Sequence, residues 1–372
     1  MSCFRPIPRL VSPNLQGQTI NRSTLSTFRV GVVPRPLPLR VIRSNTRRDH
    51  TSSSSSSLID EWSCKLTTGA PKFTYDTVDV DRISQLRRIL PTRQQQQQQQ
   101  QSSLYLEDLK EDEDLDPSFH LVLFRPKPML RDLGSDGTST EYNAPPPYTR
   151  RMWAGGSIEW SALNRSLRVG EKVTQIVNVP KVEFKMDMVF VNQQLRIYPG
   201  TLSDLGGFDE ESWSIREIRT HVFRKGPTTT TTTSTPVRPA STPSEDRDSI
   251  VSSDNSDVTF THTPSSPLLF FYSALTYNPH KVHYDHPWTI NQEGHPRPLV
   301  HGPLTATLLV ELANLNKPSG KRLKMFRYRA TSPRIIDDEI KLIGNTTENG
   351  EGMELMAVQN GNIGMKAAME YQ

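Results

Sequence analysis

The sequence predicts an α+β protein in which two similar halves are built on antiparallel β-sheet. Apolar residues alternate with polar ones in segments 177–184 and 355–358, and a period of two residues is typical of strands with one buried face. Residues 164–173 and 331–340 share a weak pattern, because each places an apolar pair before an acidic turn and then begins a strand. The Thr/Ser/Pro-rich stretch 226–267 lies between the halves, 58–225 and 268–372, and is expected to be a linker without structure.

Each half also has a predicted helix. In the first half, Ile83, Leu86 and Leu90 are spaced as on one helix face, and the glutamine run 94–101 that follows is expected to be a loop expansion. The second helix is marked by an apolar stripe of four residues, Leu304, Leu308, Leu312 and Leu315. Gly302 is its expected N-cap and Pro303 its first helical residue. This helix start would favour a developing negative charge, because free N–H groups and the positive end of the helix dipole lie there.

The N-terminal segment has the composition of a targeting sequence. Residues 1–48 contain nine Arg and nine Ser or Thr, but no Lys, Asp or Glu. Residues 1–57 are therefore expected to be a mitochondrial transit peptide and unstructured segment, with the matrix as the location. The alternative is a basic tail that binds nucleic acid. The whole chain carries a net charge of +4, so the rest of the chain carries −5 without these arginines, and a nucleic-acid partner is not expected.

Several other classes are excluded by what the chain lacks. It has two cysteines, Cys3 and Cys64, and Cys3 lies in the leader, so neither an intrachain disulfide nor a Cys-based zinc site is expected in the mature chain. No apolar run reaches the roughly 18 residues that a membrane helix needs. The sequence contains neither a P-loop nor a Gly-x-Gly-x-x-Gly motif, so no nucleotide cofactor is expected, nor any other.

The histidines are concentrated in one window. Five of the nine lie within 22 residues: His280, His283, His286, His295 and His301. Groups that titrate near neutral pH, beside a Gly-Pro helix start, are what proton transfer on a carbonyl compound needs. The spacing of the first three would also suit zinc, but prolines flank them and no second ligand cluster follows, so no metal is expected.

Three blocks of sequence resemble the MaoC-like hydratase/dehydratase group of hot-dog proteins. They are Asn278-Pro279 followed by His283-Tyr284-Asp285, Val300-His301-Gly302-Pro303-Leu304, and Arg150-Arg151-Met152-Trp153-Ala154-Gly155-Gly156. Two extra residues between the Asn-Pro pair and His283 resemble one sub-branch of that group. It contains fungal mitochondrial 3-hydroxyacyl-thioester dehydratases of type 2 and bacterial mesaconyl-type CoA hydratases. The resemblance covers residues 60–225 and 266–372.

The resemblance implies a double hot dog, with two antiparallel sheets each wrapped around a central helix. It implies a (3R)-3-hydroxyacyl-thioester dehydratase, in reverse a 2-enoyl-thioester hydratase, that acts on acyl-carrier-protein or CoA thioesters in mitochondrial fatty-acid synthesis. One alternative is a mesaconyl-type hydratase of short dicarboxylic CoA esters, and another is a catalytically inactive hot-dog scaffold. The expected assembly is a monomer or a dimer of double hot dogs.

The same resemblance assigns roles to residues of the second half. His283 is the expected acid/base group, the Gly302 N–H points at the thioester oxygen, and Asn278 fixes the loop that carries His283. Asp285 follows His283 as in the family pattern. The departure is Thr276, which stands where the family usually has a catalytic Asp. Either His280 or Asp285 replaces that Asp, or the Thr276 hydroxyl holds a water that His283 alone activates.

Other residues have two interpretations or a structural one. Arg150 and Arg151 either bind the phosphates of CoA or of an acyl-carrier phosphopantetheine, or they are an exposed pair. Trp153 is expected in the core, and His286 and His295 on the surface. His301 is expected to be a structural group that hydrogen-bonds the loop.

Overall fold

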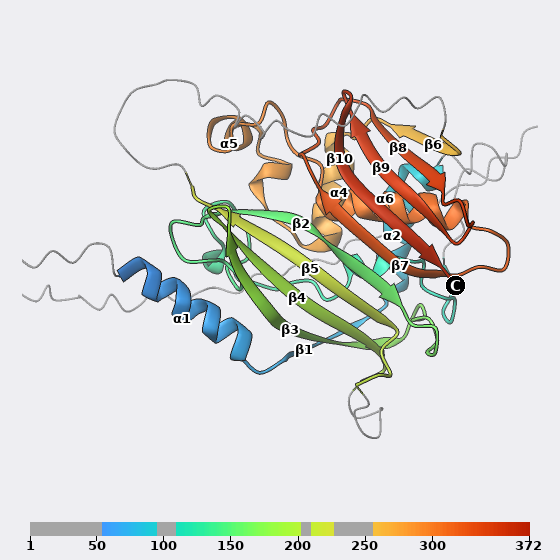
Figure 1. Cartoon of the computed structure of the whole chain (residues 1–372), viewed down its shortest axis with the longest axis horizontal. Helices are drawn as coiled ribbons and strands as arrows, with labels where there is room; N and C mark the ends of the chain where they lie inside the picture. Colours follow the sequence, from blue (N-terminus) through green and yellow to red (C-terminus); the bar gives the residue numbers. More distant parts are fainter. Residues whose placement is uncertain (1–53, 95–108, 202–209, 227–255) are drawn as a thin grey trace, which may run out of the picture. The chain divides into compact units, whose positions relative to one another are not determined.

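The computed structural model describes residues 54–94, 109–201, 210–226 and 256–372, which belong to one compact unit. Within these ranges ten antiparallel strands form a single sheet (Figure 1). The strands are β1 (Lys72–Thr77), β2 (Arg150–Trp160), β3 (Lys172–Lys185), β4 (Met188–Pro199), β5 (Ile215–Arg224), β6 (Val258–His262), β7 (Leu323–Ala330), β8 (Ile340–Thr346), β9 (Gly352–Gln359) and β10 (Asn362–Tyr371). The α-helices are α1 (Ser54–Thr68), α2 (Val80–Ile89), α4 (Ser266–Thr276), α5 (His286–Asn291) and α6 (Gly302–Leu315). Three 3₁₀ turns, η1 (Phe119–Val122), η2 (Leu130–Asp132) and η4 (Lys281–His283), lie in the connections.

The two halves have the same topology. The strand order is β1-β3-β4-β5-β2 in the first half and continues as β7-β10-β9-β8-β6 in the second, so the second half repeats the first in reverse order across the sheet. The weak repeat in the sequence corresponds to this symmetry, because segments 164–173 and 331–340 each lead into equivalent strands, β3 and β8.

The halves meet where β2 pairs with β7. Gly155 to Glu159 pair with Arg329 to Met325, which joins the strands of both halves into one sheet instead of the two sheets expected from the sequence. Gly155 is needed in this join, because a Cβ there would lie 2.7 Å from the carbonyl oxygen of Tyr328 on β7. β2 therefore lies at the centre of the molecule, with strand partners in both halves.

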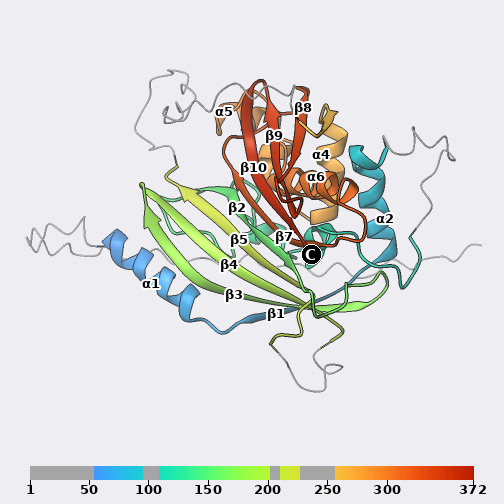
Figure 2. The same ribbon diagram turned by 45° about the vertical axis from the view of Figure 1, so that its right-hand side comes forward.

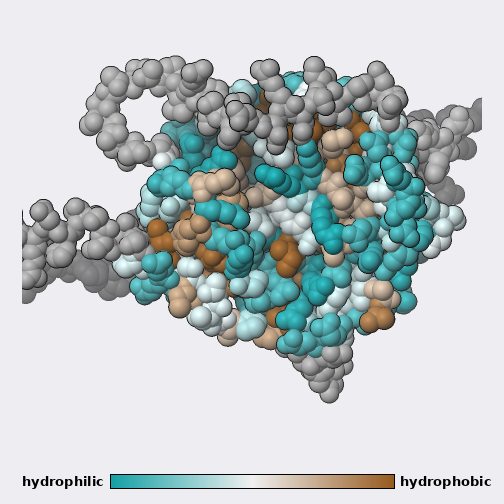
Figure 3. All heavy atoms as spheres, viewed as in Figure 1, coloured by the Kyte–Doolittle hydropathy of each residue, from teal (hydrophilic) through white to brown (hydrophobic). Residues whose placement is uncertain are grey.

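The second half of the sheet curls around α6, which lies behind β7 to β10 in Figures 1 and 2. Residues from Leu304 to Ala313 are all buried, so the helix is surrounded and not merely covered on its leucine face. The first half differs from the expectation of a central helix, because within the described residues α2 packs mainly against α4. Ile83 and Leu86 of α2, with Leu90 just after it, join the same core as α6, as their spacing predicted. The opposite face of the sheet is mostly hydrophilic in Figure 3.

Two expected boundaries were misplaced. Residues 258–262, assigned to the linker, form β6 and pair with β8, and α4 begins at Ser266. The helix α1 begins at Ser54, inside the segment 1–57 that was expected to lack structure. The expected transit peptide up to residue 53, most of the glutamine run and linker residues 227–255 lie outside the described residues. No described helix is long and apolar enough to cross a membrane.

Candidate active site

The candidate site lies on the chain between α4 and α6. The helix α4 ends at Thr276, and Tyr277 follows in the left-handed conformation, with φ of 52°. Asn278 then accepts a hydrogen bond at its side-chain Oδ1 from the N–H of His280, at 3.3 Å. This bond closes the turn that leads into η4.

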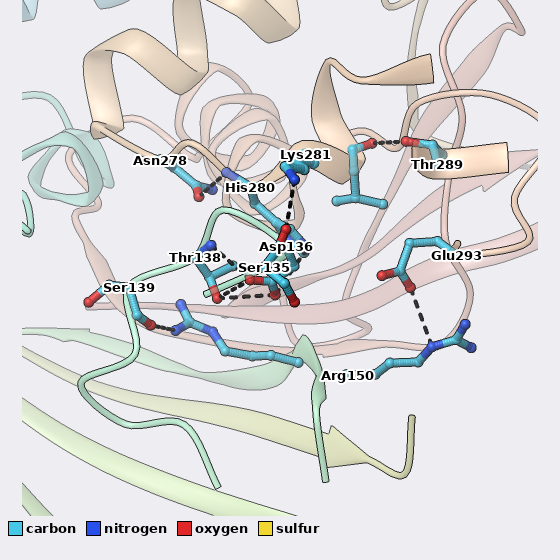
Figure 4. Close-up of polar contacts among 12 residues, drawn as sticks. Ser135, Asp136, Thr138, Ser139, Arg150, Asn278, His280, Lys281, Thr289 and Glu293 are labelled. Atoms are coloured by element: carbon cyan, nitrogen blue, oxygen red, sulfur yellow. Dashed lines mark hydrogen bonds and ion pairs between the residues drawn. The ribbon is translucent and has the colours of Figure 1, made fainter. Parts of the chain in front are cut away.

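A loop of the first half, residues 134–139, holds this turn in place. The N–H of Lys281 donates to the carbonyl oxygen of Asp136 at 2.8 Å, and its Nζ donates to that of Ser135 at 2.7 Å (Figure 4). Gly137 makes the approach feasible, because its φ is +86° and a Cβ there would lie 2.2 Å from the carbonyl oxygen of Pro279. The site is therefore assembled from both halves.

His283 has a defined tautomer. Its Nδ1 lies 2.8 Å from the carbonyl oxygen of Leu299, and because a carbonyl can only accept, Nδ1 carries the proton. The Nε2 of the neutral ring therefore has a free lone pair. Burial, with a smaller contribution from neighbouring His280, lowers the pKa of His283 to about 3, so the neutral form is present at neutral pH. The only position at which the neutral His283 ring can accept a proton is therefore Nε2.

His301 supports the ring of His283. The two imidazoles are stacked, with centroids 3.6 Å apart and planes inclined by 20°. His301 is 1 % exposed, and its Nε2 shares a hydrogen bond of 2.9 Å with Ser273 Oγ of α4. His301 was expected to be a structural group that hydrogen-bonds the loop. Its hydrogen-bond partner in the structure is instead a residue of α4, Ser273.

His280 is a second ring in contact with His283. The rings meet edge to face, with centroids 5.4 Å apart, and His280 Nε2 lies 3.8 Å from Asp136 Oδ2. Burial, and then the charge of Arg151, lower the pKa of His280 to about 4. His280 is therefore a second neutral imidazole beside His283, with a carboxylate within reach of its ring.

The other two candidates for the missing Asp are used elsewhere. Thr276 donates its hydroxyl back to the carbonyl oxygen of Tyr272 at 2.7 Å, a bond within its own helix. Asp285 caps α5 by accepting the N–H of Trp288 at 2.9 Å. Of the three alternatives left open by the sequence, His280 is the one whose side chain faces His283.

The start of α6 lies beside these rings. Its N-cap is His301 and not Gly302 as expected; Gly302 is the first helical residue. Among the described residues no group accepts a hydrogen bond from the Gly302 N–H, which is normal for a first-turn donor. Trp153 of β2 packs on Gly302. A Cβ added to Gly302 would lie 3.5 Å from Trp153 Cβ, which is ordinary contact distance. Trp153 is partly buried and packs against the main core, as expected.

Arg150 and Arg151 have different surroundings. Arg150 donates to the carbonyl oxygen of Gln292 at 2.7 Å and faces Glu293 at 3.6 Å; Figure 4 shows it pointing away from Asp136 and His280. Arg151 instead donates to the carbonyl oxygen of Ser139, at 3.3 Å, at the base of the loop that contacts the site. The two neighbours therefore do not act as one pair.

The two remaining histidines of the window, His286 and His295, do not join this group of rings. His286 is exposed and His295 partly exposed. Within the described ranges, no group of three His, Cys, Asp or Glu residues is arranged to hold a metal ion.

Sequence reasoning missed Asp136, Ser273 and the loop 134–139. These residues belong to no motif and lie far from the histidine window in the chain or on a different element. The Gly-Ser-Asp-Gly wording of 134–137 predicts a turn, but nothing in it indicates which part of the fold the turn contacts.

Two comparisons of sequence define the class. The family model described as hydroxyacyl-thioester dehydratase type 2 matches residues 118–336. Mesaconyl-C(4)-CoA hydratase of Chloroflexus aurantiacus is 31 % identical over 252 residues, which cover 66 % of this chain and 79 % of that protein. The mitochondrial hydroxyacyl-thioester dehydratase type 2 of Schizosaccharomyces pombe is 30 % identical over 88 residues, which cover 23 % of this chain and 29 % of that protein.

Solved structures show the fold. A MaoC-like dehydratase of Phytophthora capsici aligns with a TM-score of 0.57 at 15 % identity, over 83 % of this chain and 98 % of that chain. HtdX of Mycobacterium tuberculosis aligns with a TM-score of 0.52 at 11 % identity, over 80 % and 99 %. The fold and the sequence together define a MaoC-like hydro-lyase of the hot-dog class. The chain belongs to the hydroxyacyl-thioester dehydratase type 2 family.

Proposed function

We propose that this chain adds water to 2-enoyl thioesters, and in reverse dehydrates 3-hydroxyacyl thioesters, with His283 as the proton-transferring group. The observation that carries the proposal is the tautomer of His283. Its Nδ1–H is fixed to Leu299, its Nε2 has a free lone pair, and its ring stacks on His301, the residue just before the first N–H group of α6. A fixed base beside an oxyanion donor is the arrangement that enolate chemistry needs.

In the hydration direction, a water oxygen adds to the β-carbon of the substrate and gives a proton to His283 Nε2. Electrons move to the thioester oxygen, which becomes enolate-like and accepts the Gly302 N–H. The proton on His283 is then passed to the α-carbon, the His283 ring becomes neutral again, and the thioester carbonyl is restored. A positioned His contributes about 10²–10⁴-fold to such a step, and one oxyanion donor about 2.7–4 kcal/mol.

His280 takes the place of the missing Asp in this proposal. Its ring lies edge to face on His283, and Asp136 is near its Nε2. It therefore orients the attacking water and passes protons between His283 and the substrate. Thr276 directs its hydroxyl proton at the carbonyl oxygen of Tyr272, so it has no proton to pass to the substrate.

Two substrate classes follow from the relatives. Acyl-carrier-protein or CoA thioesters of mitochondrial fatty-acid synthesis are suggested by the fungal relative and by the acid-free leader. Short dicarboxylic CoA esters are suggested by the Chloroflexus aurantiacus relative, which matches more of the chain. A catalytically inactive scaffold is the third possibility, and any turnover excludes it.

A substrate panel separates these classes. The full chain is assayed with crotonyl-CoA, longer 2-enoyl-CoA esters, mesaconyl-CoA and an enoyl-acyl-carrier protein. A rate that rises with chain length on the carrier protein supports fatty-acid synthesis, and a preference for mesaconyl-CoA supports the second class. If the protein hydrates none of these thioesters, the proposal is contradicted.

The matrix is the proposed location, because an arginine-rich leader without acidic residues is drawn inward by the membrane potential. Residues 1–57 are fused to a fluorescent reporter for the test. Import and cleavage are expected, and a reporter that stays in the cytosol or enters the nucleus contradicts the location.

A further inference from the structure

Glu217 and Arg219 of β5 form an ion pair inside the first half. Arg219 donates from Nε to Glu217 Oε1 at 2.8 Å and from Nη2 to Oε2 at 2.9 Å. Both side chains lie on the same face of the strand, because they are two residues apart. Glu217 is 0 % exposed, and His120 Nε2 of η1 lies 3.4 Å from its Oε2. Two parallel bonds to a buried carboxylate fix the plane of the Arg219 guanidinium.

The guanidinium of Arg219 in turn contacts Trp153 of β2. Arg219 Cζ lies 5.5 Å from the centroid of the Trp153 ring, which is within the range of a cation–π interaction. Tyr328 of β7 meets the same ring edge to face, with centroids 5.8 Å apart. Because β2 lies between β5 and β7 in the sheet (Figure 1), the Trp153 ring is held by one neighbour from each half.

Trp153 connects this group of side chains to the candidate active site. A Cβ added to Gly302 would lie 3.5 Å from Trp153 Cβ and 3.5 Å from its ring atom Cε3, so the ring packs on the first residue of α6. The N–H of Gly302 is the proposed oxyanion donor. Such a donor contributes most when it is fixed before the reaction and shielded from water, and an indole ring packed on the backbone serves both purposes.

We propose that Glu217 and Arg219 are positioning residues of the oxyanion site: Glu217 fixes the Arg219 guanidinium, and the guanidinium holds Trp153 against the first turn of α6. The inference rests on the proposed function, because it needs the Gly302 N–H to bind the thioester oxygen. It adds a role in the reaction for an ion pair of the first half, whereas His283 and Gly302 belong to the second.

A matched pair on the same strand provides the control. Arg216 donates to Glu159 at 2.8 Å, and its Cζ lies 4.8 Å from the centroid of the Trp213 ring. The chemistry is the same, an Arg–Glu pair beside a tryptophan. Residue 216 is an odd number of positions from 217 and 219, so its side chain lies on the opposite face of β5, away from Trp153.

The first test measures crotonyl-CoA hydration by the full chain with Arg219→Met or Arg216→Met. Each change keeps an unbranched side chain and removes the charge. For Arg219→Met, kcat should fall about tenfold or more with little change in KM, because a small displacement of a group that acts in the transition state is costly. Arg216→Met should stay near the wild-type rate even if its melting temperature falls.

A double-mutant cycle with Gly302→Pro tests whether this loss is transmitted through the oxyanion donor. Gly302→Pro has no N–H for Trp153 to position. Arg219→Met should therefore lower kcat much less in the Gly302→Pro protein than in the wild type, because coupled residues have non-additive effects. An ion pair that serves only folding would cost the same factor in both backgrounds.

A second variant and a second measurement cover a protein that does not fold. Arg219→Met leaves Glu217 buried and unpaired, so Glu217→Leu is combined with it to remove the pair as a whole. Butyryl-CoA, a saturated thioester that cannot be hydrated, reports the hydrogen bond to its carbonyl without turnover. Its infrared carbonyl frequency should be lowered on wild-type and Arg216→Met protein, and should return toward the free value on the variant that lacks the Glu217–Arg219 pair.

The outcomes separate the inference from the proposed function. Full activity of folded Arg219→Met, an equal loss in Arg216→Met, or equal factors in the two backgrounds of the cycle overturns the inference and leaves the function standing. Full activity of folded Gly302→Pro overturns the donor assigned under the proposed function, and the inference with it. Failure of the wild type on every thioester overturns both.

Discussion

The imidazole rings of His283 and His301 are stacked at 3.6 Å, and both rings are neutral in the folded protein. Burial is the main cause for both rings, and a charge on His283 would further oppose protonation of His301, because two cations at that distance would repel. Burial therefore keeps His283 neutral, and the stack together with the hydrogen bond to Leu299 fixes the direction of its Nε2.

This gives a prediction for the pH dependence of activity. The pKa of His283 is lowered to about 3, below the usual value near 6.5. In the proposed mechanism the neutral ring is the active form, so kcat/KM for hydration should show no acid limb near pH 6.5. An inflection there, measured on folded protein across pH 5 to 8, would indicate a His283 that is solvated rather than buried.

The same shifts predict how stability depends on pH. Six histidines have lowered pKa values in the folded protein: His221, His262, His280, His283, His295 and His301. The unfolded chain binds more protons below about pH 6.5, so stability present above that pH is lost as pH falls toward the folded pKa values. The melting temperature should therefore decline between pH 6.5 and 4. A melting temperature that is constant or rises there contradicts this.

Gly302 can be tested with a matched pair of variants. Gly302→Pro removes the N–H proposed to bind the thioester oxygen, and the preceding His301 has φ of −60° and ψ of 131°, which a following proline accepts. We expect a loss of about a hundredfold or more in kcat. Gly302→Ala retains the N–H and adds a Cβ at an ordinary contact distance of 3.5 Å from Trp153, so it should lose much less. Equal losses in two folded variants, checked by circular dichroism, would assign the effect to packing.

Because β6 lies within the segment expected to be linker, only part of that segment should be dispensable. Deleting residues 228–254 should leave the melting temperature and turnover nearly unchanged, because loop length costs little entropy. Deleting 228–263 also removes Val258–His262, which pairs with β8 and places Phe260 in the core, so it should destabilise the protein. If both deletions melt alike, β6 does not contribute to the stability of the second half.

The ion pair between Arg93 and Glu311 joins the helical turn 91–94 to the middle of α6. Arg93 Nη2 donates to Glu311 Oε1 at 2.8 Å, and the Glu311 side chain is fully buried. Arg93→Ala should destabilise the protein by about 3–5 kcal/mol, because it leaves a buried carboxylate unpaired. The double variant Arg93→Leu with Glu311→Leu should recover most of this in urea unfolding. A double variant as unstable as the single one would show that packing, and not the unpaired charge, causes the loss.

The local pattern of apolar residues predicted individual helices and strands better than it predicted which strands pair with one another. The leucine stripe gave α6, and the alternation gave β3 and β9, because each depends on residues close in sequence. The pairing of β2 with β7 could not be predicted in this way, because it joins strands about 170 residues apart. β6 was missed because it lies at the end of a Thr/Ser-rich stretch, although Val258-Thr259-Phe260 has the alternation of a strand.

In the candidate site, too, residues in a local motif could be predicted, whereas residues brought in by tertiary contacts could not. His283, His280 and the helix start at Gly302 were found from their motif, and the structure brings them together around His301. Asp136 was not found, because it reaches His280 only through the tertiary contact between loop 134–139 and Lys281. The different surroundings of Arg150 and Arg151 likewise depend on which face of β2 each side chain takes.

The measurement that tests the central claim most directly is the rate of crotonyl-CoA hydration by wild-type protein and by His283→Ala, followed by loss of enoyl-thioester absorbance. Acid–base help is felt in the transition state, so kcat should fall by at least about a hundredfold with little change in KM. His286→Ala, an exposed histidine three residues away, serves as the control and should stay near the wild-type rate. A folded His283→Ala protein with full hydratase activity would contradict the account and make His280 the next candidate.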